Sequence, residues 1–138
     1  MNLYSILETT ESRFNFMKGL IRVAKADEVI EESEFTFFNE LATSMQLDSD
    51  NISQLNALWS SNEPIYVSFD KPEEKILFFT QAIQLCWIDD SYNGKEKNQI
   101  IELAKELGVS STEILEIEKW VEEGINWNKR FSELLQLR

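Results

Sequence analysis

The chain has 138 residues and a formal net charge of −12 at pH 7, from 13 Lys and Arg against 25 Asp and Glu. That length suits one domain with its own core. A content of only 4 Gly and 2 Pro argues against a turn-rich β-sandwich or barrel and favours helices. An acidic surface repels phosphate backbones and anionic lipids, so we expect no nucleic-acid binding and no membrane docking. Cations or basic protein surfaces are the partners that such a charge attracts.

The sequence contains no histidine and a single cysteine, Cys86. Histidine is the commonest general base and transition-metal ligand, so no Ser-His-Asp or Cys-His arrangement and no multi-Cys zinc site can form. Cys86 lies in an apolar run, where we expect a buried structural thiol that fits a reducing compartment. The first residues do not resemble a signal peptide, and no apolar run is long enough to span a bilayer. We therefore expect a cytoplasmic protein that is not an enzyme.

Apolar residues recur at three- and four-residue spacing along most of the chain, which is the pattern of amphipathic helices. Seven helices are predicted, at about residues 10–26, 32–45, 49–59, 70–88, 95–107, 110–123 and 128–137. A connector at about 61–71 is predicted to be extended, because Pro64, Ile65 and Val67 disfavour a helix there. The predicted fold class is therefore all-α.

Local signals mark several of these helix ends. Pro72 is tolerated in the first turn of a helix, and Glu73 suits its positive end. Gly108 is well placed as a left-handed terminator. Ser110 and Glu113 have the S-x-x-E spacing of a capping box. These signals predict helix starts near residues 70 and 110 and a helix end at Gly108.

The sequence matches itself when it is shifted by 62 residues without a gap. Residues 14–52 against 76–114 give nine identities in 39 pairs, and most other apolar positions remain apolar. We predict two pseudo-symmetric helix-hairpin repeats, at about 10–60 and 72–124, which share one core within a single domain.

The shift also aligns two acidic positions of each half. The candidate metal ligands are Asp27, Glu34, Asp89, Asp90 and Glu96. In each half an Asp follows one helix and a Glu lies in the first turns of the next. The acids could simply cap the hairpins, since carboxylates are favourable at helix N-termini. They could instead converge with loop carbonyls on a hard divalent cation such as Ca²⁺, Mg²⁺ or Mn²⁺. An EF-hand is excluded, because Ile100 would occupy the loop position that needs a bidentate Glu.

The run from Val23 to Ile30, followed by Glu34, resembles the "A-D-G-x-I-x-x-x-E" signature of the tellurite-resistance TerB-like family. The run from Ile88 to Tyr92, followed by Glu96, resembles it again, and the resemblance covers about residues 10–125. It implies an all-helical fold of two repeated hairpin units. It also implies a bacterial, stress-associated protein that acts by binding, including binding of metal, and not by catalysis.

The resemblance carries the acidic signature positions onto Asp27, Glu34, Asp89 and Glu96. The family's Gly after each Asp is replaced by Glu28 and Asp90, which changes the expected shape of the first loop, since Glu tolerates a positive φ poorly.

Three functional interpretations follow from these residues. The first is a non-catalytic interaction or adaptor protein that holds a divalent cation on its acidic hairpins. The second is a structural interaction module whose acidic face binds a basic protein without metal. The third, a small hydrolase or isomerase, would need a deep pocket that holds two carboxylates.

Overall fold

The computed structural model describes residues 3–26, 32–88 and 94–137. In these ranges it contains six helices of ten residues or more, one single-turn helix and no strand. The helices are α1 (Leu3–Ile6), α2 (Thr10–Lys25), α3 (Glu32–Ser44), α4 (Ser49–Leu58), α5 (Pro72–Ile88), α6 (Lys95–Leu107) and α7 (Ser111–Gln136). The prediction of an all-α fold is confirmed.

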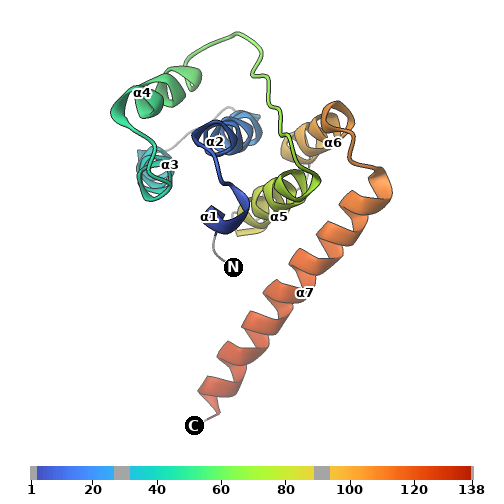
Figure 1. The fold of residues 1–138 in the computed structure, drawn as a ribbon. Helices are drawn as coiled ribbons and strands as arrows, with labels where there is room; N and C mark the ends of the chain where they lie inside the picture. The colour runs from blue at the N-terminus through green and yellow to red at the C-terminus, as the bar shows by residue number, and fades with distance from the viewer. Residues whose placement is uncertain (1–2, 27–31, 89–93, 138) are drawn as a thin grey trace.

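Helices α2 and α5 pack against each other at the centre of the molecule (Figure 1). Their contact includes the rings of Phe16 and Phe78, which meet edge to face with centroids 6.1 Å apart. Helix α4 packs on α2, α7 packs on α5, and α6 packs on both central helices. Helix α3, in contrast, packs chiefly against α4. The two halves of the chain thus bury their apolar faces in one continuous core.

The connector between α4 and α5 is extended, as predicted. Ile65 and Phe69 anchor it by burying their side chains in the core. The backbone is also tied to α2, because Arg22 donates to the carbonyl of Ile65 at 3.1 Å and Lys25 donates to that of Ser61 at 2.7 Å. Side-chain donors of α2 therefore satisfy carbonyls that have no sheet or helix partner.

The last two predicted helices are one continuous helix, so the predicted break between Gly124 and Asn128 is wrong. A glycine inside a helix costs only about 1 kcal/mol relative to alanine, and no proline follows it to stop the helix. Trp127, expected at a helix junction with part of its side chain exposed, lies instead within α7 and is 74% exposed.

The single turn α1 was not predicted as a helix. It is held because Leu7, the next residue, is fully buried, and because Nε of Arg13 donates to the Leu7 carbonyl at 2.8 Å. The predicted docking of this N-terminal segment on the core is therefore correct for Leu7.

Several finer predictions are confirmed. Cys86 is buried. Gly108 ends α6 with a φ of 74°, and the Ser110 side chain caps α7 by accepting from the backbone N–H of Glu113 at 3.1 Å. Of the helices in residues 3–26, 32–88 and 94–137, none combines the length and apolar character that crossing a bilayer requires.

Candidate functional site

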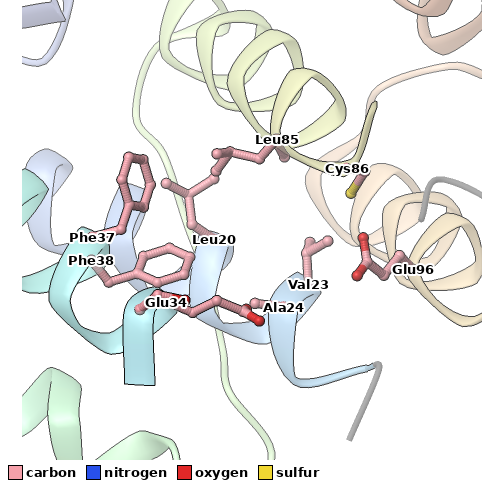
Figure 2. Close-up of a pocket in the computed structure, with 11 residues that line it drawn as sticks. Leu20, Val23, Ala24, Glu34, Phe37, Phe38, Leu85, Cys86 and Glu96 are labelled. Carbon is pink, nitrogen blue, oxygen red and sulfur yellow. The ribbon is translucent and has the colours of Figure 1, made fainter. Parts of the chain in front are cut away.

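A cavity of about 290 Å³ lies where α2, α3, α5 and α6 meet (Figure 2). Its lining is organised by the 62-residue spacing found in the sequence. Eight of its eleven lining residues form four pairs with that separation: Leu20 and Ala82, Val23 and Leu85, Ala24 and Cys86, Glu34 and Glu96. The cavity is therefore formed by equivalent positions of the two halves.

Glu34 and Glu96 bring two carboxylates to this cavity. Glu34 lies in the first turn of α3 and Glu96 in the first turn of α6, where the positive end of a helix favours an anionic side chain. In Figure 2 the two side chains extend toward the end of α2 from opposite sides. Glu96 is only 7% exposed, and carboxylates are rarely buried to this degree without charged or hydrogen-bonding partners.

The remaining walls are mostly apolar. Leu20, Phe38 and Leu85 contribute aliphatic and aromatic surface, and Phe37 lines the cavity while remaining 44% exposed. A cavity of this kind combines apolar surface with a small number of fixed polar groups, which is the usual composition of a ligand-binding site. It suits a ligand that carries positive charge.

The five predicted metal ligands are only partly placed. Glu34 and Glu96 line the same cavity, whereas Asp27, Asp89 and Asp90 lie outside the described residues. Among the residues that the structure does describe, no three His, Cys, Asp or Glu side chains form a group that could hold a metal ion. Two carboxylates supply at most four oxygens, fewer than the six to eight that Ca²⁺ takes.

The apolar half of the cavity was missed by the sequence analysis, which assigned such residues to the core. A signal was nevertheless present. Phe37 and Phe38 are neighbours on a helix and point about 100° apart, so only one of them can lie at the centre of the buried face. Phe38 is buried and Phe37 is not.

Compared with protein-family models, curated proteins and solved structures, the chain matches none of them. Function is therefore inferred from the cavity and its chemistry.

Proposed function

We propose that this chain is a TerB-like, non-catalytic binding module of a bacterial stress-associated system. Its two repeated units share one cavity, which takes a divalent cation. Glu34 and Glu96 each contribute a carboxylate, and the sequence assigns Asp27, Asp89 and Asp90 as the further ligands. The observation that supports this proposal most directly is that Glu34 and Glu96, predicted independently in the two halves, line one cavity.

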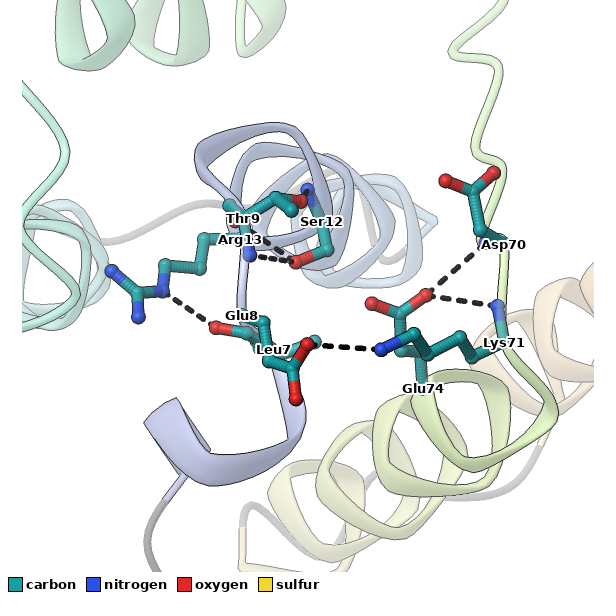
Figure 3. Close-up of polar contacts among 8 residues, drawn as sticks. All are labelled: Leu7, Glu8, Thr9, Ser12, Arg13, Asp70, Lys71 and Glu74. Atoms are coloured by element: carbon teal, nitrogen blue, oxygen red, sulfur yellow. Dashed lines mark hydrogen bonds and ion pairs between the residues drawn. The ribbon is translucent and has the colours of Figure 1, made fainter.

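The starts of the two central helices support the repeat. Helices α2 and α5 begin 62 residues apart, at Thr10 and Pro72. Before α2, the Ser12 hydroxyl accepts from the backbone N–H of Thr9 at 3.2 Å. Before α5, the Glu74 carboxylate accepts from the N–H of Lys71 at 3.0 Å (Figure 3). Ser12 and Glu74 are also 62 residues apart, so the same bond closes both helix starts with different chemistry.

The ends of α3 and α6 repeat in the same way. Gln46 has a φ of 63° and Gly108 has a φ of 74°, which is the left-handed conformation that ends many helices. The next residues, Leu47 and Val109, each donate a backbone hydrogen bond to the carbonyl five positions earlier, at 3.2 and 2.8 Å. All four residues obey the 62-residue spacing. A shared backbone geometry at non-identical residues is what a duplicated unit would retain.

A divalent cation fits the chemistry of the carboxylates. Oxygen ligands from Asp and Glu are those that Ca²⁺, Mg²⁺ and Mn²⁺ prefer. A chain with a net charge of −12 also concentrates cations near its surface. Ala24 and Cys86 line the cavity and each precede a predicted Asp ligand by three residues. The short sequence separation favours ligands from both loops.

Thermal unfolding of metal-stripped protein, with and without millimolar Ca²⁺, Mg²⁺ or Mn²⁺, tests the proposal. An ion at 100 times its dissociation constant adds about 2.7 kcal/mol, which for this size raises Tm by roughly 8 °C. Glu34→Gln and Glu96→Gln keep the side-chain shape and should abolish the rise. Glu40→Gln is the matched control, because Glu40 is an exposed residue of α3 that does not line the cavity.

A second candidate, a basic partner bound without metal, is favoured by the apolar walls. A lysine side chain joins an aliphatic stem to an ammonium group, which matches Leu20, Phe37 and Leu85 beside two carboxylates. Hexylammonium is a suitable probe and hexanol its uncharged control. Stabilisation by hexylammonium alone, lost in Glu96→Gln, would replace the metal proposal with this one. If neither ions nor hexylammonium shift Tm, both proposals fail and the carboxylates serve the fold.

A further inference from the structure

The C-terminal half of α7 has no neighbour within the described part of the chain. Figure 1 shows this half projecting away from the other helices. The buried residues of α7 all lie in its first half: Ile114, Ile117 and Val121. Beyond them, the large apolar side chains are exposed: Trp127, Phe131, Leu134, Leu135 and Leu137.

These exposed side chains form a stripe with heptad spacing. Its members are Trp120, Gly124, Trp127, Phe131 and Leu134, separated by four, three, four and three residues. This alternation is that of the a and d positions of a coiled coil. At 100° per residue, the stripe is turned by roughly a quarter revolution from the face that packs on α5. The apolar stripe of α7 is therefore a separate surface and not an extension of the core face.

The apolar stripe has a hollow beside its most exposed tryptophan. A hollow of about 450 Å³ is lined by Trp120, Gly124 and Trp127 together with Gln84 of α5. A side chain built on Gly124 would meet no atom within 4 Å. One heptad of α7 thus presents both a space without a side chain and a large aromatic that could fill such a space, which is the complementarity of a knob and a hole.

The charges beside the apolar stripe are complementary under a two-fold axis. Glu123 and Arg130 flank the stripe on the same edge, one heptad apart. In an antiparallel pair whose axis passes near Asn126, Glu123 of each copy lies opposite Arg130 of the other. The same axis places Trp127 of each copy over Gly124 of the other.

The overall charge of the chain also permits contact at this place. Residues 119–138 carry four basic and three acidic side chains, a net +1, whereas residues 1–118 carry nine and 22, a net −13. Two copies therefore repel each other least through α7.

From these observations we infer that α7 pairs antiparallel with α7 of a second copy of this chain, through its apolar stripe. A parallel pair is disfavoured. It would place Glu123 opposite Asn128 and Arg130 opposite Leu135, and would leave the hollow at Gly124 facing another glycine. The antiparallel dimer buries Trp127 at the centre of the interface, where aromatic anchors contribute most.

Sedimentation equilibrium of the full chain from micromolar to sub-millimolar concentrations tests the dimer. Trp127→Glu should raise the dissociation constant more than about a hundredfold, since a charge would be buried at the interface. Lys129→Glu is the matched control, because residue 129 lies on the side of α7 opposite the stripe. The Tm of both variants in dilute protein should match that of the wild type. A monomeric wild type, or a Trp127→Glu variant that dimerises equally tightly, would overturn the inference.

A charge exchange tests the antiparallel orientation. Glu123→Arg or Arg130→Glu alone should raise the dissociation constant about tenfold at low salt, because each creates two like-charge pairs. The double exchange restores both pairs and should return the constant to within about threefold of the wild-type value. A double variant as weak as either single variant would exclude this register.

Discussion

Gly19 is the position where a single methyl group should test the packing of α2 on α5. A Cβ built on Gly19 would lie 2.7 Å from Cζ of Phe78, and closer still to Cε1 of the same ring. Phe78 cannot move aside easily, because it is fully buried and packs with the rings of Phe16, Phe69 and Phe79 at centroid distances of 6.1, 5.7 and 5.0 Å. Two opposing terms then decide the effect of Gly19→Ala.

Alanine gains about 1 kcal/mol of helix propensity over glycine, whereas overpacking a core costs about 1–3 kcal/mol. The contact with Phe78 is too short for the upper end of that range to be avoided, so we expect a net loss of about 2 kcal/mol. In thermal unfolding this lowers Tm by roughly 8 °C. Urea unfolding followed by tryptophan fluorescence measures the change directly.

Gly124→Ala is the matched control, since it changes the same residue types in a helix interior with nothing within 4 Å of the new methyl. In dilute protein it should gain up to about 1 kcal/mol. If Gly19→Ala is as stable as the wild type, α2 and α5 do not approach each other as described, and the reasoning is refuted.

Three further predictions concern single residues. Gln46→Gly should stabilise the protein by about 0.5–1 kcal/mol in urea unfolding, because Gln46 has a positive φ that glycine adopts without strain; equal or lower stability would contradict this. Arg22→Lys should cost about 1–3 kcal/mol, because lysine cannot reproduce the guanidinium bonds to Gln99 and to the Ile65 carbonyl, both 3.1 Å; an unchanged urea midpoint would count against it. Burial lowers the pKa of Lys18 below its ordinary 10.5, so Lys18→Met should be more stable than the wild type near neutral pH. That difference should shrink as pH rises toward 10.5, because the folded state then releases the proton before the unfolded state does. A pH-independent difference would exclude this explanation.

The fold class was predictable because helix signals here are local and redundant. Pro72 opens α5 and Gly108 closes α6, as the sequence indicates. Asp48 and Ser110 cap α4 and α7 through bonds to the backbone N–H three residues later. Each of these effects depends on one turn of chain, so it can be deduced without knowing the tertiary structure.

The features that were missed depend on contacts between distant segments or on weak penalties. Gly124 suggested a helix end, but the cost of one glycine is small beside the bonds of a helix that continues on both sides. The shared cavity was also beyond local reasoning. Nothing in the sequence states that Glu34 and Glu96 face the same space, since this depends on how α3 and α6 are placed around α2.

The cavity lies where the two halves differ most in packing. In the second half, α6 buries Ile100, Leu103, Ala104 and Leu107 and packs on both central helices. In the first half, α3 buries only Phe38 and Ala42 and packs chiefly on α4. An equally close α3 would bring its apolar face against α5 and fill the space that Phe37 and Leu85 now line. The departure from strict symmetry thus leaves a cavity between otherwise equivalent positions. A bound cation would join the halves there through one carboxylate from each.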